Sequence, residues 1–102
     1  QPMRNLLKSL FGGGDTTDFK EKVKDGAIIV DVRTPGEFAG GHTKNARNIP
    51  LDTLPTKISQ IQGWEKPVVV CCASGMRSSR AKSLLGAKGI EVYDAGPWNN
   101  LA

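Results

Sequence analysis

The sequence predicts a small α/β domain with a mainly parallel central sheet flanked by helices. Two short apolar runs, Ala27 to Val32 and Val68 to Cys71, are rich in β-branched residues. Such runs are typical of strands that are buried on both faces of a parallel sheet. Segments with helical spacing alternate with these runs, and short turns join them, as in parallel strand–helix units. A chain of 102 residues has room for one domain of this kind.

The chain is expected to divide at a glycine-rich joint. Residues 1–14 predict a short amphipathic segment with helical spacing that ends in Gly12 to Gly14, and residues 15–102 form the folded domain. The first helix of that domain is expected to begin between Thr16 and Asp18 and to stop at Gly26. The first buried strand, Ala27 to Val32, follows directly.

The middle of the chain has signals for a short helix and an edge strand. Thr34 to Glu37 form the pattern of a capping box, with Pro35 at the first helical position, and Gly40 ends the turn. Arg47 to Ile49 precede Pro50 and are expected to form a short edge strand, because proline has no amide hydrogen for a central ladder.

The second half of the chain repeats the alternation of helix and strand. Leu54, Ile58 and Ile61 recur about one turn apart and predict a helix before the valine strand. After that strand, the spacing of Ala81, Leu84 and Leu85 predicts a helix. It is expected to run from about Arg77 to Lys88, with Gly89 as its stop and Glu91 to Tyr93 as the last strand.

Composition and charge exclude several classes of function. The net charge of +4 favours anionic partners weakly, but the basic residues are scattered from Arg4 to Lys88 without a basic block, so nucleic-acid binding is not expected. No apolar run approaches the ~18 residues of a membrane span, so no membrane association is expected. A cytoplasmic location is expected, or a periplasmic one if a signal peptide has been removed upstream of Gln1.

The two cysteines point to chemistry rather than to architecture. Cys71 and Cys72 are adjacent, which excludes a loop-stapling disulfide framework and a zinc site with four cysteine ligands. No metal or cofactor is expected. Cys72 stands where a buried strand turns into a helix, so free amide groups and the positive end of the helix dipole favour its thiolate. Arg77 adds a cation, and Gly75 lets the backbone turn tightly around a bound anion.

The choice of nucleophile decides the class of reaction. Four residues separate Cys72 from Arg77, and a loop of that length suits one extra sulfur atom. Five residues separate Cys71 from Arg77, which is the spacing of a cysteine-dependent phosphatase or arsenate reductase. Counted from Cys71, however, Gly75 falls one position later than that pattern favours. Cys71 continues the valine strand, so Cys72 is expected to be the first loop residue and the nucleophile.

The chain resembles the rhodanese family of single-domain sulfurtransferases. The family pattern Cys-x-x-Gly-x-Arg-Ser is present at Cys72 to Ser78, directly after a run of valines. Further family stretches lie at Ile28 to Phe38, Gly41-His42, Asn48 to Leu51, Gly89 to Tyr93, Gly96 and Trp98. Together they cover residues 16–101 in the family's order, which makes the resemblance specific where a single motif would not be.

The resemblance implies a rhodanese-like domain that moves sulfane sulfur through a persulfide on Cys72. The donor would be a small anion such as thiosulfate, or a persulfide, and the acceptor cyanide, a small thiol or a protein thiol. The terminal sulfur would be held by the loop and the start of the helix, at Ala73, Ser74, Gly75, Met76 and Ser78. Arg77 would assist or close the loop, and Asp31 and Arg33 would orient the donor from a neighbouring strand end.

Each of these residues also has a structural alternative, which for Cys72 is that of a buried, inert thiol. Cys71 is expected to act as a small core residue rather than as a resolving thiol, a partner in a strained disulfide or a phosphatase nucleophile. Arg77 could pair with an acidic residue, and Asp31 with Arg33 could brace the turn. A structural role is expected for His42 and a core or lid role for Trp64 and Trp98. A binding module of rhodanese shape without turnover is the remaining functional alternative.

Overall fold

The computed structural model describes residues 18–101, so the expected segment at residues 1–14 lies outside the described residues. Its elements follow the chain in the order α2 (Asp18–Lys24), β1 (Ile28–Asp31), α3 (Pro35–Ala39), β2 (Arg47–Asn48), α4 (Leu54–Trp64), β3 (Val68–Cys72), α5 (Met76–Ala87), β4 (Val92–Pro97) and the 3-10 helix η2 (Trp98–Leu101). The alternation predicted from the sequence is confirmed.

A four-stranded sheet forms the centre of the domain. Its strands lie in the order β2-β1-β3-β4, and each neighbouring pair is parallel. The short strand β2 is at an edge, as its proline neighbour predicts. All the strands point the same way, so the segments that leave their carboxyl ends gather at one edge of the sheet.

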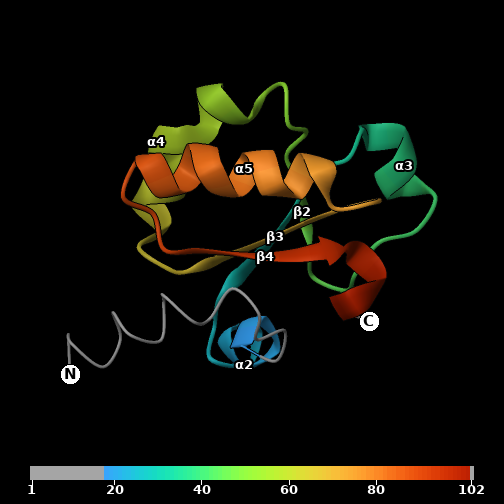
Figure 1. The fold of residues 1–102 in the computed structure, drawn as a ribbon, viewed down its shortest axis with the longest axis horizontal. Coiled ribbons are helices and arrows are strands. Elements are labelled where there is room, and N and C mark those ends of the chain that lie inside the picture. The colour runs from blue at the N-terminus through green and yellow to red at the C-terminus, as the bar shows by residue number, and fades with distance from the viewer. Residues whose placement is uncertain (1–17, 102) are drawn as a thin grey trace.

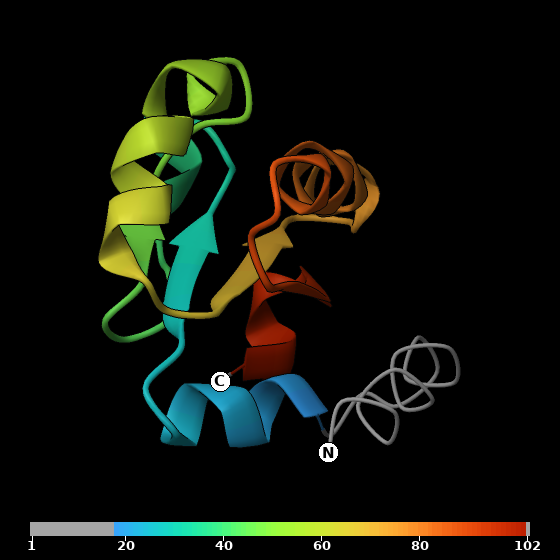
Figure 2. The ribbon, with the colours of Figure 1, turned by 90° about the vertical axis from the view of Figure 1, so that its left-hand side faces the viewer.

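Helices cover both faces of the sheet. In Figures 1 and 2, α4 and α5 both lie toward the upper side of the view, and α2 lies below the strands. One buried cluster joins alternate strand residues to α4 and α5, through side chains that include Leu54, Ile61, Ala81 and Leu85. The other cluster joins the opposite strand face to α2 and the C-terminal segment, through Phe19 and Ala95 among others. No helix among residues 18–101 has the length and apolar character needed to cross a membrane.

Local signals account for the element ends that position the site. The side chain of Thr34 accepts a hydrogen bond from the Glu37 amide, and the Glu37 carboxylate accepts one from the Thr34 amide, so the predicted capping box is present at α3. Gly89 has a positive φ of 80° just beyond α5.

Strand β1 is one residue shorter at each end than expected, β2 ends at Asn48 rather than Ile49, and α5 begins at Met76 rather than Arg77. Two further differences bear on the site. Cys72 is the last residue of β3 rather than the first residue of the loop, because it pairs with Pro97 of β4. Strand β4 itself continues to Pro97, beyond the expected Glu91 to Tyr93. The pairing of β3 with β4 shifts in register between Val70 and Cys71. Val70 pairs with Asp94 and Cys71 pairs with Gly96, so β4 has one additional residue, Ala95, at this point.

Candidate active site

The two adjacent cysteines point to opposite faces of the sheet. Cys72 belongs to the buried cluster beneath α4 and α5, whereas Cys71 belongs to the cluster on the side of α2. This is the alternation of a β-strand, in which successive side chains leave on opposite sides. Both cysteines are free thiols. A disulfide between them is incompatible with this geometry, and the Cys71 sulfur is turned away from the loop that follows Cys72.

The loop after β3 turns back over the Cys72 sulfur. The Gly75 amide donates a hydrogen bond to Cys72 Sγ with a nitrogen–sulfur distance of 2.9 Å. Gly75 has φ of 105°, a left-handed conformation that strongly favours glycine. The Ser78 hydroxyl lies 3.4 Å from the same sulfur and donates to the Gly75 carbonyl oxygen at 3.1 Å. The start of α5 is therefore folded around this sulfur, as the sequence predicts.

The surroundings of the two thiols shift their pKa values in opposite directions. Burial alone raises the pKa of Cys72, but the side-chain hydrogen bond with Ser78 and hydrogen bonds from the amides of Ser78, Gly75 and Ser74 outweigh it, and the net pKa is lowered. For Cys71, burial and the nearby Asp31 carboxylate raise the pKa to about 12. Of the two thiols, both fully buried, Cys72 therefore forms a thiolate more readily, and Cys71 remains a thiol at neutral pH.

This difference predicts selective alkylation. Iodoacetamide should modify Cys72 with a rate whose pH midpoint lies below the ~8.5 of an ordinary cysteine, since the thiolate is the reacting form. Cys71 should stay unmodified up to pH ~10, because its pKa is about 12. Mass spectrometry of peptides after timed labelling between pH 5 and 10 distinguishes the two sites. Earlier labelling of Cys71 than of Cys72 would contradict the assignment.

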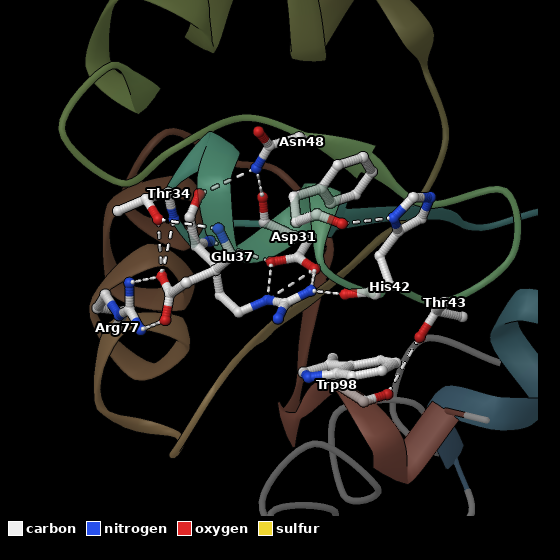
Figure 3. A network of polar contacts seen from close by, with 11 residues as sticks. Asp31, Thr34, Glu37, His42, Thr43, Asn48, Arg77 and Trp98 are labelled. Carbon is white, nitrogen blue, oxygen red and sulfur yellow. Dashed lines mark hydrogen bonds and ion pairs between the residues drawn. The ribbon is translucent and has the colours of Figure 1, made fainter.

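Arg77 is joined to Glu37 of α3 rather than to the sulfur. Its two terminal nitrogens donate to the two carboxylate oxygens of Glu37 at 2.7 and 3.0 Å, a bidentate pair drawn in Figure 3. This contact, together with hydrogen bonds from Thr34, lowers the pKa of Glu37 to about 2. The pKa of Arg77 is raised, first by the hydrogen bonds to Glu37 and to a lesser extent by attraction to Cys72. Arg77 therefore ties the first turn of α5 to α3.

Asp31 and Arg33 form a buried ion pair at the end of β1. The Arg33 guanidinium donates to both carboxylate oxygens of Asp31 at 2.7 to 3.0 Å, and its Nη2 also donates to the Gly41 carbonyl oxygen at 2.7 Å. The guanidinium lies over the Trp98 ring, 4.8 Å from the centroid. Asp31 is fully buried and Arg33 is 5% exposed. These contacts brace the turn after β1, which is the structural alternative considered from the sequence.

Three polar residues of this network were not singled out as site residues from the sequence. Glu37 was identified only as a helix cap, and no local pattern announces a partner 40 positions away. Asn48 Nδ2 donates to the carbonyl oxygens of Asp31 and Arg33, and Thr43 Oγ1 donates to the Trp98 carbonyl oxygen (Figure 3). Glu37 lies inside α3, Thr43 in the loop before β2 and Asn48 at the end of β2, so no shared local pattern indicates that they meet.

His42 has the structural role expected for it. Its Nδ1 lies 2.7 Å from the Phe38 carbonyl oxygen, and its ring stacks on the Phe38 ring. Among residues 18–101, no group of three or more His, Cys, Asp and Glu side chains is arranged to hold a metal ion.

Comparisons with known proteins identify the family of this chain. The family model for the rhodanese-like domain matches residues 15–96. The chain belongs to the rhodanese-like family. YqhL of Bacillus subtilis is 44% identical over 69 residues, which cover 67% of this chain and 54% of YqhL. This rhodanese-like domain therefore spans about half the length of that relative.

Two further relatives support the same family. The thiosulfate sulfurtransferase GlpE of Stutzerimonas stutzeri is 38% identical over 69 residues, covering 67% of this chain and 62% of GlpE. The crystal structure of a rhodanese-like domain protein from Staphylococcus aureus superposes with a TM-score of 0.70 at 32% identity, covering 85% of this chain and 87% of that one. The predicted fold, a small α/β domain of rhodanese type, is confirmed.

Proposed function

We propose that this rhodanese-like domain is a sulfurtransferase that carries sulfane sulfur as a persulfide on Cys72. The observation that carries the proposal is the contact of 2.9 Å between the Gly75 amide and Cys72 Sγ, in a loop that lowers the pKa of this thiol. A thiolate is the form of cysteine that attacks a sulfur donor. The similarity to a relative named thiosulfate sulfurtransferase supports the same reaction class.

In the loading step, the Cys72 thiolate attacks the outer sulfur of the donor. A bond forms between Sγ and that sulfur, and the bond from the outer sulfur to the rest of the donor breaks. The leaving group takes the electron pair and departs as sulfite when the donor is thiosulfate, or as a thiolate when the donor is a persulfide. In the second step, cyanide or a thiolate attacks the outer sulfur and Cys72 leaves as a thiolate again.

The residues around Cys72 would act through backbone and charge. The amides from Ala73 to Ser78, which include those of Ser74, Gly75 and Met76, are suited to hold the negative terminal sulfur of the persulfide. Arg77 would assist the loop by keeping the first turn of α5 in place through its ion pair with Glu37. Asp31 and Arg33 would support the neighbouring strand end and so act as positioning residues.

The phosphatase alternative loses support from the same geometry. It requires Cys71 as the nucleophile, but the Cys71 sulfur is buried on the other face of the sheet and its pKa is raised to about 12. A buried thiol of that acidity does not supply the thiolate that attack on a phosphate ester requires.

Sulfur uptake can be measured directly by mass spectrometry. After incubation with thiosulfate, or with an aromatic thiosulfonate as a bulkier donor, the intact protein should gain the mass of one sulfur atom. Peptide mapping should place that sulfur on Cys72, and cyanide should remove it. A protein that stays unmodified with both donors would instead be a binding module of rhodanese shape.

A further inference from the structure

The segment from Cys72 to Ser78 contains a single cationic side chain, that of Arg77. The residues between the nucleophile and this arginine, Ala73 to Met76, are uncharged. Thiosulfate and thiosulfonates have an oxyanion group next to the sulfur that is transferred. Attack by a thiolate on such a donor brings negative charges together, and a nearby cation opposes that repulsion. Arg77 is therefore the residue of this segment whose charge attracts an oxyanion donor.

The charge of Arg77 acts on the Cys72 sulfur. Hydrogen bonds to Glu37 are the largest cause of the raised pKa of Arg77, and attraction to Cys72 is a further cause. Arg77 lies in the first turn of α5, two positions after Gly75, whose amide donates to Cys72 Sγ. A donor that reaches this sulfur is thus within the electrostatic influence of the Arg77 guanidinium.

The two terminal nitrogens of Arg77 are already occupied by Glu37. They donate to Oε1 and Oε2 of its carboxylate at 2.7 and 3.0 Å, so the positive charge is balanced (Figure 3). Glu37 stays ionised at neutral pH, because its pKa is lowered to about 2. A sulfonyl or sulfite group presents its oxygens to arginine in the same paired way as a carboxylate. Such a group therefore competes with Glu37 for the same two nitrogens.

The exposure of this ion pair allows an anion to exchange with Glu37. The side chains of Arg77 and Glu37 are 34% and 37% exposed, so a dissolved anion can reach them. The ion pair of Arg33 with Asp31 differs, because its side chains are 6% and 0% exposed and Arg33 also donates to the Gly41 carbonyl oxygen. Arg33 is therefore committed to the fold, whereas Arg77 is available to a donor that displaces Glu37.

We propose that Glu37 is a positioning residue that sets the donor preference of Cys72, because a donor with a sulfonyl or sulfite group must displace its carboxylate from Arg77. The proposal rests on the proposed function and narrows the class of donor. A persulfide without an oxyanion group loads Cys72 without this displacement, so the ion pair favours persulfides over thiosulfate. When thiosulfate reacts, a bond forms between Cys72 Sγ and the outer sulfur, the bond between the two thiosulfate sulfurs breaks, and sulfite leaves with the electron pair. Arg77 stabilises that leaving group only after Glu37 has released it.

Glu37→Gln separates the charge of this residue from its role as a helix cap. Glutamine serves at the third helical position of a capping box as glutamate does, so the hydrogen bond from the Thr34 amide can be kept. The measurement is the rate of sulfur loading on Cys72, followed by mass spectrometry, from thiosulfate and from the persulfide of N-acetylcysteamine, which has no oxyanion group. The ratio of the thiosulfate rate to the persulfide rate is expected to rise ~10-fold in Glu37→Gln at low salt, and the gain should shrink near ~0.5 M salt.

Alkylation measures the same charge without sulfur transfer. Iodoacetate is an anion and iodoacetamide is neutral, and the two reagents are similar in size. The ratio of their rates at Cys72 reports the electrostatic potential at the sulfur, and any change in the opening of the loop cancels from this ratio. Glu37→Gln should raise the ratio of iodoacetate to iodoacetamide ~5-fold, because the positive charge of Arg77 is no longer balanced.

Three variants serve as controls. Glu21→Gln, at an exposed position of α2, changes the net charge equally and should keep both native ratios. Glu37→Asp keeps a carboxylate near Arg77 and should stay close to the native ratios. Glu37→Gln combined with Arg77→Gln has the net charge of the native protein and should lose the gain, because the uncovered cation is gone.

The outcomes separate this proposal from the proposed function. If Cys72 takes up no sulfur from either donor, the sulfurtransferase function and the donor preference both fail. If Cys72 loads but Glu37→Gln leaves the donor ratio unchanged, or the double variant keeps the gain, sulfur transfer stands and Glu37 does not set the donor. If Glu37→Gln speeds loading by both donors and alkylation by both reagents equally, the ion pair only restrains the loop and the proposal is overturned.

Discussion

Replacing Cys72 with serine is expected to abolish sulfur uptake and to lower the rate of transfer by at least ~10³-fold, as loss of a covalent nucleophile does in other enzymes. A serine hydroxyl is a poor nucleophile at neutral pH and does not form the persulfide bond. Serine is close to cysteine in size, so the fold should survive. The measurement is the gain of sulfur mass after incubation with an aromatic thiosulfonate, together with the rate of thiocyanate formation from cyanide.

The neighbouring thiol supplies the matched control. Cys71→Ser should keep sulfur uptake on Cys72, because the Cys71 side chain lies on the other face of the sheet. It should lose about 1–3 kcal/mol of unfolding free energy, since it places a hydroxyl in an apolar cluster. Cys71→Ala, which buries no polar group, keeps the comparison valid if the serine variant is too unstable. Retention of activity in Cys72→Ser and its loss in both Cys71 variants would reverse the assignment.

Arg33→Ala is expected to cause a large loss of stability, about 3–5 kcal/mol in the free energy of unfolding. The substitution leaves the fully buried Asp31 carboxylate without its cation. It also removes the hydrogen bond to the Gly41 carbonyl oxygen and the stacking on Trp98. Urea unfolding followed by circular dichroism measures the change. Arg33→Lys, which keeps the charge, should fold and show a smaller loss if the alanine variant does not fold.

Arg47 offers a close control for the stacking contact. Its guanidinium also lies 4.8 Å from a tryptophan centroid, that of Trp64, but its side chain is exposed. Arg47→Ala should therefore cost no more than about 1 kcal/mol, the value of a cation–π contact at an exposed site. Equal losses for Arg33→Ala and Arg47→Ala would show that the buried ion pair contributes little to stability.

Much of the fold could be predicted from the sequence because its local signals agree with one another. The valine run before Cys72 has the composition of a strand buried on both faces, and its residues 68–72 are all buried. The capping box at Thr34 and Glu37 predicted the start of α3, and the spacing of Leu54 and Ile61 predicted α4. The Cys72 loop was predictable for the same reason, since a strand end, a glycine and a helix start are local features.

The parts that could not be predicted depend on contacts between distant segments. Cys72 belongs to β3 because β4 extends as far as Pro97 and pairs with it, and the length and register of β4 are not visible in the sequence around Cys72. The sequence does not predict which acidic residue pairs with Arg77, because any carboxylate that the fold brings nearby could do so. The structure selects Glu37, which already serves as a cap, so one carboxylate links two elements.

The opposite orientation of the two cysteines also limits how the protein can recover from damage by peroxides. A sulfenic acid on the Cys72 sulfur is normally rescued when a nearby thiol condenses with it. Cys71 is next in sequence, but its sulfur lies across the sheet and cannot reach. Repair of an oxidised Cys72 therefore depends on a reductant supplied from solution.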